Sequence, residues 1–333
     1  MYRREEMETQ SREKKRALNK RSVKGGAGPL IRRWICLLTA MLMLGMGCAS
    51  GESAIQLPID MSGGMPLAEK YSPKTEVYED PTIRVELHRV DGNDTEWKVY
   101  YYYALISLQD ASQLRTAAAD GKSFVSRAKA PAQTIARRVN AALAINGDYS
   151  GTDFGGKGDT FILRQGTLFR DDTSSELDLL LIDEDGDFHV LSRNEENRNI
   201  DKTEIDGKKV INAFQFGPAL VIDGQKVPDG ELIDKSHSPL HAEPEGRAQR
   251  MCIAQIGPLQ YMVLCCRWGL SLTSLRDLAM SLADCRTVYT LDGGNSTQLI
   301  FLGQKINNVK SDGDNVRPIT DIIYFASANG AGQ

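Results

Sequence analysis

The spacing of apolar side chains along the chain predicts many short strands. In residues 82–90, Ile83, Val85 and Leu87 alternate with polar residues, which is the period of a half-buried strand. Residues 98–108 are rich in tyrosine and continue this pattern after a polar turn. On the same criteria, further strands are expected at residues 143–145, 160–164, 177–182, 188–191, 217–222, 251–256, 261–266, 288–291, 297–302 and 319–325.

Two segments instead follow the period of a helix. Pro131 opens the first, which extends to Leu143, and proline suits a first helical turn because its φ is already helical. Thr273 is expected to cap the second, which extends to Leu282. The chain is therefore predicted to be an α+β protein, with a mixed, largely antiparallel sheet and a few packed helices in a single domain at 78–328.

Each predicted helix leads into a short apolar strand that stops at a polar, glycine-flanked loop, within residues 131–150 and 274–296. Loops at the ends of buried strands often carry binding and catalytic residues. Asp-Gly-Gly is also a frequent hairpin turn, so both interpretations stay open. If the loops form a site, the glycines let a ligand approach the backbone and the polar residues supply donors and acceptors. The candidates are then Asn146, Gly147, Asp148, Asp292, Gly293, Gly294, Asn295 and Ser296.

The part of the chain expected to fold is acidic. Residues 1–33 hold eleven Lys and Arg against four Glu, so the rest carries a net charge of −11 within the total of −4. This balance disfavours a nucleic-acid partner. Arg250 and Arg267 stand out because they border apolar, strand-like segments, where a guanidinium needs either a structural carboxylate or a bound anion such as phosphate. Weaker candidates of the same kind are Arg164, Arg247 and Arg317.

The N-terminal residues indicate targeting rather than fold. An apolar run at 34–46 follows the basic arm, is too short to span a bilayer comfortably, and fits a signal-peptide core. Cleavage after Ala49, lipidation of Cys48 and retention as a signal anchor are the alternatives. We assign residues 1–50 to a cytoplasmic basic arm with this signal or anchor, and 51–77 to a linker. The domain is therefore expected outside the cytoplasm, either secreted or held at the membrane by its N-terminal segment.

Several enzyme classes lack their signatures. The chain has no GxSxG elbow, no P-loop and no strand–GxGxxG–helix unit, which removes support for serine hydrolase, nucleotide kinase and dehydrogenase functions. His237 and His241 have the spacing of helical metal ligands, but Pro239 between them disfavours a helix. The acidic turn at 183–187 lacks the later Glu of a calcium loop. No metal and no cofactor are expected.

The cysteines beyond the N-terminal segment leave two possibilities. If residues 257–260 form a tight hairpin turn, Cys252 and Cys265 fall opposite each other on paired strands, where an oxidising compartment would allow a disulfide. Free buried cysteines are the other possibility.

Six short blocks of the sequence resemble the phosphodiester glycosidase family, and they follow the family's order across residues 140–326. The chain departs from the family pattern at Ala254, Cys266 and Asn295, which bears on the substrate more than on the fold. The blocks are AINGDY at 144–149 (family INGG/D-aromatic), FGPALVIDG at 216–224 (FGPxLVxDG), RMCIA at 250–254 (RTAIG), Arg267 (the end of DGR), TLDGGNST at 290–297 (NLDGGGSST) and RPITD at 317–321.

The resemblance implies a hydrolase that cuts a sugar from a phosphodiester at its anomeric carbon, in an envelope or exopolysaccharide glycan, with an N-acetylglucosamine-type sugar favoured. It implies Asp292 as nucleophile or base with Asp148 as its partner carboxylate. Arg250 and Arg267 would neutralise the leaving phosphate, and the other loop residues would hold the substrate. The alternative is a non-catalytic binding protein for phosphorylated envelope glycans, which carboxylates beside the loops disfavour. The expected partner is thus a sugar phosphodiester or phosphorylated glycan, and the oligomeric state is not predicted.

Overall fold

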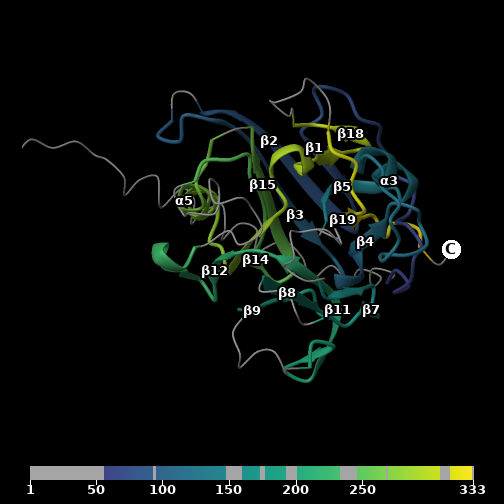
Figure 1. Ribbon diagram of the computed structural model, residues 1–333. Helices are drawn as coiled ribbons and strands as arrows, with labels where there is room; N and C mark the ends of the chain where they lie inside the picture. The colour runs from purple at the N-terminus through teal and green to yellow at the C-terminus, as the bar shows by residue number, and fades with distance from the viewer. Residues whose placement is uncertain are drawn as a thin grey trace, which may run out of the picture. The chain divides into compact units, whose positions relative to one another are not determined.

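The strands of the described residues form three antiparallel sheets, whose strands are labelled in Figure 1. All described residues belong to one compact unit, Ser53–Gln333. The predicted α+β class is confirmed, because strands dominate and two α-helices pack on them, although the expected sheet is divided into three. The computed structural model describes residues 56–92, 95–147, 160–172, 177–192, 201–232, 246–267, 269–307 and 316–331.

The eight-stranded sheet is built around a central hairpin of β14 and β15. Its order is β1 (Val77–Asp80), β2 (Ile83–Asp91), β3 (Tyr100–Leu108), β15 (Gln260–Cys266), β14 (Met251–Gly257), β16 (Thr287–Leu291), β12 (Ala219–Ile222) and β13 (Gln225–Lys226).

The two smaller sheets complete the framework. The six-stranded sheet has the order β7 (Thr167–Arg170), β6 (Ile162–Arg164), β11 (Lys208–Phe216), β8 (Asp178–Asp183) and β9 (Phe188–Leu191), with β10 (Glu204–Ile205) also paired to β11. The five-stranded sheet has the order β18 (Gln304–Lys305), β17 (Leu299–Phe301), β5 (Ala141–Asn146), β19 (Asp321–Ala326) and β4 (Leu114–Ala118). The helices are α3 (Ala132–Arg138) and α5 (Leu272–Leu282), with the short 3-10 turns η2 (Ala111–Gln113), η4 (Asp229–Glu231) and η5 (Gly294–Ser296).

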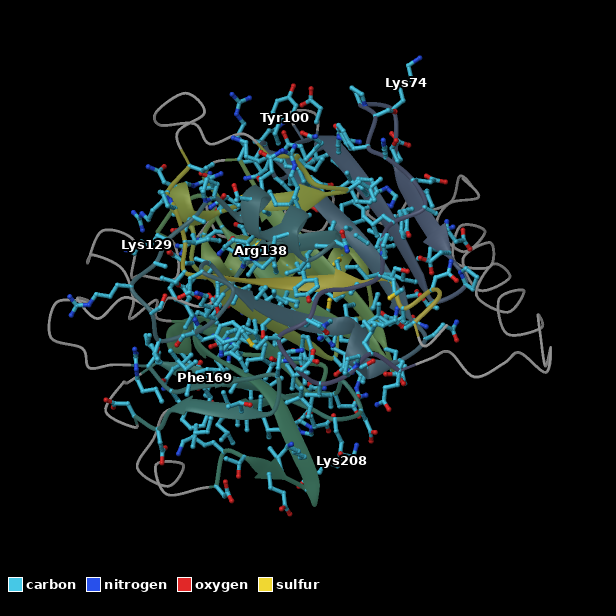
Figure 2. The ribbon with its side chains drawn as sticks, turned by 90° about the vertical axis from the view of Figure 1, so that its right-hand side faces the viewer. Lys74, Tyr100, Lys129, Arg138, Phe169 and Lys208 are labelled. Atoms are coloured by element: carbon cyan, nitrogen blue, oxygen red, sulfur yellow. The ribbon has the colours of Figure 1, made fainter. Side chains whose placement is uncertain are left out.

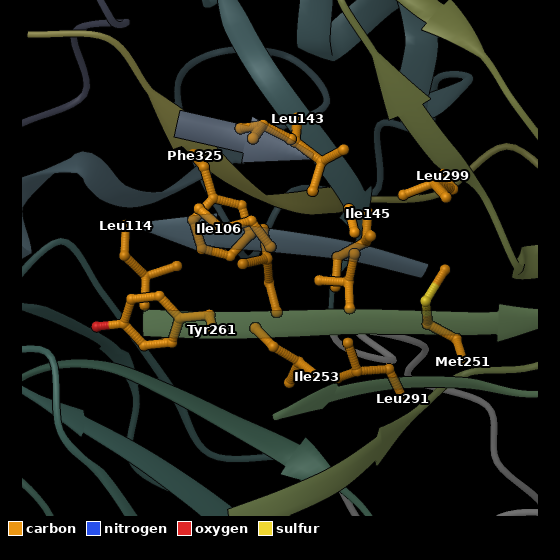
Figure 3. Packing of buried hydrophobic residues seen from close by; sticks show 14 of the residues in the cluster. Ile106, Leu114, Leu143, Ile145, Met251, Ile253, Tyr261, Leu291, Leu299 and Phe325 are labelled. Atoms are coloured by element: carbon orange, nitrogen blue, oxygen red, sulfur yellow. The ribbon is translucent and has the colours of Figure 1, made fainter. Parts of the chain in front are cut away.

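Side chains from all three sheets share the main hydrophobic core, and Figure 3 labels several that the eight-stranded and five-stranded sheets contribute. Ile253, Tyr261 and Leu291 line it from the eight-stranded sheet. Ile145 and Phe325 line it from the five-stranded sheet, and β11 adds two buried phenylalanines. Fully burying one such side chain contributes about 1.5–3 kcal/mol. This core therefore fixes the ends of β5 and β16, from which the two glycine loops emerge.

Each α-helix covers the other face of one sheet. Leu275 and Leu278 of α5 pack with Cys252 on the eight-stranded sheet. Ile135 of α3 packs with Tyr324 on the five-stranded sheet. Figure 1 shows the two helices on opposite sides of the strands.

Local chemistry sets where the helices begin and end. The first helix starts after Pro131 as predicted, but it does not reach its predicted end, because Asn140 adopts a φ of 52° and turns the chain into β5. The second helix starts earlier than predicted. The Ser271 side chain, not that of Thr273, accepts the capping hydrogen bond, from the backbone N–H of Ser274.

Among the described residues, the strands that were not predicted are β1, β4, β7, β10, β11, β13 and β18, of which β11 is the longest. β11 is buried continuously from Val210 onward, so it lacks the alternation that marks a half-buried strand. It also contains Asn212 and Gln215, whose side chains are buried and accept backbone hydrogen bonds. A fully buried strand with satisfied polar residues therefore looks like a loop in the sequence.

The linker predicted at 51–77 contains no helix or strand within 56–76. Part of it nevertheless packs on the domain. Leu57 is buried, and the buried guanidinium of Arg115 donates hydrogen bonds to three backbone carbonyls within residues 58–62. Backbone carbonyls need donors when they leave water, and Arg115 supplies them here.

The hairpin of β14 and β15 excludes the Cys252–Cys265 pairing. Cys252 lies opposite Leu264, and Cys265 lies opposite Met251. A shift of one residue places the two thiols on opposite faces of the sheet. The free, buried cysteines of the described residues are Cys252, Cys265, Cys266 and Cys285.

No helix within the described ranges is long and apolar enough to cross a membrane. The predicted signal or anchor at 34–46 lies outside those ranges.

Candidate active site

The two glycine loops found in the sequence lie side by side in the structure. β5 ends at Asn146, and its side-chain Nδ2 donates a hydrogen bond of 2.9 Å to the backbone oxygen of Asp292, just beyond β16. The backbone N–H of Asn146 donates to the oxygen of Gln298 at 3.2 Å. The five-stranded and eight-stranded sheets thus contribute one loop each to the same candidate site, where Asn146 contacts Asp292.

Asp292 is held at the end of a row of paired strands. Leu291 pairs with Met251, and Met251 pairs with Cys265, so Asp292 and Arg250 leave neighbouring strands at the same end. The side chain of Asp292 is 10% exposed. The site therefore holds a carboxylate that is largely shielded but still reachable from solvent.

Arg317 forms an ion pair with this carboxylate. Its Nη1 lies 3.8 Å from Oδ2 of Asp292 and donates a 3.3 Å hydrogen bond to Oγ of Ser296. Its backbone N–H donates to the oxygen of Asn295 at 3.0 Å. Its side chain remains 55% exposed, so the guanidinium can also contact a ligand.

The glycines of the second loop have different roles. A Cβ on Gly293 would lie 2.3 Å from the backbone oxygen of Gln249, so only glycine fits against the start of β14. Gly294 opens η5 with a φ of 55°, and a Cβ there would meet open space. The loop sequence thus serves local packing at one position and leaves room for a ligand at the next.

The first loop rests on a buried ion pair. A Cβ on Gly147 would lie 2.5 Å from a carboxylate oxygen of Asp321, and its N–H donates to the Asp321 backbone oxygen at 3.0 Å. Arg164 places Nε and Nη2 each 3.1 Å from Oδ2 of Asp321. The Arg164 guanidinium also lies over the ring of Phe214, 4.2 Å from its centroid. Arg164 is therefore a structural partner below the loop, not an exposed ligand.

The structure places Arg250 and Arg267 differently from the sequence prediction. The buried Arg250 guanidinium donates to the backbone oxygens of Gly246 (2.9 Å) and Leu270 (3.4 Å). Backbone carbonyl oxygens thus accept hydrogen bonds from Arg250, for which the sequence left open a structural carboxylate or a bound anion. Arg267 is exposed rather than buried, and its backbone N–H donates to the oxygen of Tyr100.

The thiol beside Arg250 is not a reactive group. Sγ of Cys266 accepts a 3.2 Å hydrogen bond from the Arg250 N–H. Burial raises the pKa of the Cys266 thiol to about 11, so it stays neutral at ordinary pH.

Some predicted positions cannot be placed. Asp148 directly follows Gly147 but lies outside the described residues, as do His237 and His241. Within the described residues, no three His, Cys, Asp or Glu side chains are grouped so that they could hold a metal ion.

From the sequence, Arg317 was only a weaker candidate for contact with an anion, and Gln298 was not a candidate. Gln298 lies within the strand predicted at 297–302, where nothing distinguished it from its neighbours, and in the structure both Gln298 and Arg317 lie in irregular segments beside the loop. The one available signal was the RPITD block, which carries Arg317 and Asp321 together.

Comparisons with known proteins agree with this fold. A sequence model of the phosphodiester glycosidase family matches residues 139–326. The structure is similar to the catalytic domain of zebrafish N-acetylglucosamine-1-phosphodiester alpha-N-acetylglucosaminidase, auto-inhibited by its pro-peptide, with a TM-score of 0.58 and 14% identity over 78% of this chain and 87% of that one. A hypothetical protein from Synechocystis matches with a TM-score of 0.46 and 14% identity, over 76% of this chain and 64% of that one. A search of curated protein sequences finds no match.

With the family match spanning more than half of its length, the chain belongs to the phosphodiester glycosidase family.

Proposed function

We propose that this protein hydrolyses the bond between the anomeric carbon of a sugar and a phosphodiester oxygen, in an envelope or exopolysaccharide glycan. The observation that carries the proposal is the shielded carboxylate of Asp292 with the exposed guanidinium of Arg317 at 3.8 Å. Family membership supports the reaction class. The name of the zebrafish structural relative supports an N-acetylglucosamine-type sugar as the first substrate to test.

In the proposed reaction, Asp292 attacks the anomeric carbon or activates a water that does so. The C1–O bond breaks, and its electron pair leaves with the phosphate oxygen. Water supplies the new hydroxyl on C1, so the products are a free sugar and a phosphate monoester. Asp148 is retained as the proposed partner carboxylate.

A phosphate monoester is a good leaving group, so neutralising its charge matters more than protonating it strongly. Arg317 is the group we propose for this role, because it is exposed, charged and held by the loop that carries Asp292. We keep Asn295 and the backbone at Gly294 as proposed substrate contacts, whereas Ser296, which is buried and accepts a hydrogen bond from Arg317, is proposed to hold that arginine. Arg250 and Asn146 are assigned to support the loop, since their hydrogen bonds run to the protein itself.

We also propose that the reaction takes place outside the cytoplasm. The basic arm and apolar run before the domain support this placement, and residues 34–46 would act as signal or anchor.

The test uses purified residues 52–333 with UDP-N-acetylglucosamine and a simple N-acetylglucosamine-1-phosphodiester, and follows release of free sugar. Release that depends on Asp292 supports the proposal. If neither compound releases sugar while both bind saturably, the protein is instead a non-catalytic binder of phosphorylated glycans.

A further inference from the structure

Gln298 lies between the second glycine loop and β17, and all its hydrogen-bonding groups are in use. It is 1% exposed. Its side-chain Nε2 donates to the backbone oxygen of Arg317 at 3.0 Å, and its Oε1 accepts from the N–H of Ala132, the first residue of α3, at 2.9 Å. Its backbone N–H donates to Oδ1 of Asn146, and its backbone oxygen accepts from the Asn146 N–H, both at 3.2 Å.

These hydrogen bonds connect Gln298 to Asp292 by two separate paths. From Gln298, the backbone bonds lead to Asn146, whose side chain holds the backbone oxygen of Asp292. From the side chain of Gln298, the other path leads to Arg317, whose Nη1 lies beside the Asp292 carboxylate. One residue therefore fixes both the main chain of the carboxylate and the cation next to it.

The two paths depend on different parts of Gln298. Its main chain holds Asn146, and a side-chain substitution leaves those atoms in place. Its side-chain amide, and not its main chain, bonds to the backbone oxygen of Arg317 and to the backbone N–H at the start of α3. We propose that Gln298 is a positioning residue that keeps Arg317 in place to receive the departing phosphate, an inference that rests on the proposed function.

Two substitutions separate the bonds. Gln298→Met removes both side-chain hydrogen bonds at similar volume. An ionised carboxylate in Gln298→Glu still accepts from Ala132 but cannot donate to the Arg317 oxygen. When that buried carboxyl is protonated, its O–H can donate again, and burial raises the pKa of such a group. The activity of Gln298→Glu relative to wild type should therefore fall as pH rises, whereas that of Gln298→Met should stay level.

Gln255 provides a matched control. It is also 1% exposed, its Oε1 accepts from the N–H of Phe188, and its Nε2 donates to Oδ1 of Asp187. It lies on β14 five residues from Arg250, which is about 17 Å along a strand and away from the loop. Gln255→Met loses the same kind of bonds outside the site.

The experiment compares wild type, Gln298→Met, Gln298→Glu and Gln255→Met by hydrogen exchange, thermal unfolding and sugar release. We expect faster exchange in peptides covering residues 316–320 for both Gln298 variants but not for Gln255→Met. We also expect kcat/KM to fall about tenfold or more in Gln298→Met and to stay within about twofold in Gln255→Met, since small misplacements of catalytic groups are costly. The melting temperatures of the two Met variants should be similar.

Equal exchange at residues 316–320 in all four proteins would overturn the inference, because Gln298 would then not hold this segment. Faster exchange with unchanged kcat/KM would overturn it as well. If wild type releases no sugar, the proposed function fails, and exchange together with the affinity for inorganic phosphate decides whether Gln298 positions Arg317: a Gln298→Met affinity equal to that of wild type would reject it.

Discussion

Two acidic regions of this protein differ in the groups that contact their carboxylates. The turn between β8 and β9 carries Asp183, Asp185 and Asp187. Nζ of Lys208, a residue labelled in Figure 2, lies 2.9–3.5 Å from a carboxylate oxygen of each. Asp183 also accepts the N–H groups of the other two aspartates and contacts Nε2 of His189 at 3.0 Å. Hydrogen bonds within the turn, together with Lys208 and His189, hold its carboxylates.

In the loop after β16, the carboxylate of Asp292 is paired with a more exposed cation. Asp292 has an ion partner 3.8 Å away, and that partner, Arg317, is more than half exposed. A Cβ at Gly294 would meet open space. The comparison teaches that a dense acidic cluster can be purely structural, whereas a single carboxylate with an exposed cation leaves capacity for a ligand.

The largest expected effect comes from Asp292→Asn. If the comparison holds, sugar release falls at least about a thousandfold, because the amide is neither a nucleophile nor a base. Unfolding should change little. Asp183→Asn is the control. Release close to wild type in that variant would confirm that the loop after β16, and not the turn between β8 and β9, takes part in the reaction. Full release by Asp292→Asn would show that the loop is not the active site.

Arg317→Gln should have the next largest effect. Loss of the cation that neutralises the leaving phosphate is expected to lower kcat/KM about a hundredfold. Its free energy of unfolding should stay close to wild type, since the side chain is mostly exposed. Arg250→Met provides the contrast: the oxygens of Gly246 and Leu270 lose a donor, so we expect a loss of about 2 kcal/mol in unfolding free energy. A larger kinetic effect for Arg250→Met would reverse the two roles.

Asp183→Asn should act on stability alone. Its carboxylate is fully buried and accepts hydrogen bonds from backbone and His189, so denaturant unfolding should show a loss of about 2 kcal/mol. Asp185→Asn is the matched change on an exposed carboxylate, with an expected loss below about 0.5 kcal/mol. Equal losses would mean that burial does not distinguish the two aspartates.

The smallest effect is a pH dependence at His189. Its hydrogen bond to Asp183 raises the pKa of His189, with further support from Asp206 and Asp187. The folded state thus favours the protonated form, and this stabilisation is complete below the ordinary pKa of 6.5 and is lost as pH rises through the raised value. His189→Gln should therefore lower the free energy of unfolding more at pH 5.5 than at pH 8.5 in chemical denaturation. An equal cost at both pH values would contradict this.

Much of the fold was accessible from the sequence, either through alternation of apolar and polar residues or through continuous apolar runs. The alternation around Val85 predicted β2, and the runs at 251–256 and 261–266 predicted the central hairpin. β11 was missed because both of its faces are buried and its polar side chains are satisfied internally. The cap at Ser271 was missed because Ser and Thr two residues apart are equivalent in sequence.

The candidate site was only partly accessible. The glycine pattern identified both loops, and the residues Asp292 and Asn146 lie where the loops meet. The pattern could not distinguish residues that contact a substrate from residues that hold the loops in place. Asn146 and Arg250 have the side-chain chemistry of substrate ligands, but their hydrogen bonds go to the protein, and Arg317 became prominent only through its position beside Asp292.

The sequence by itself determined the family, the class of fold and the two loops, because periodicity and short motifs are local properties of the chain. The tertiary structure decided which charges meet. Arg164 and Asp321 are 157 residues apart, and Asn146 and Asp292 are 146 apart, yet each pair is in contact. Burial and hydrogen-bond partners depend on such long-range contacts, and they decide whether an arginine supports the fold or faces a ligand.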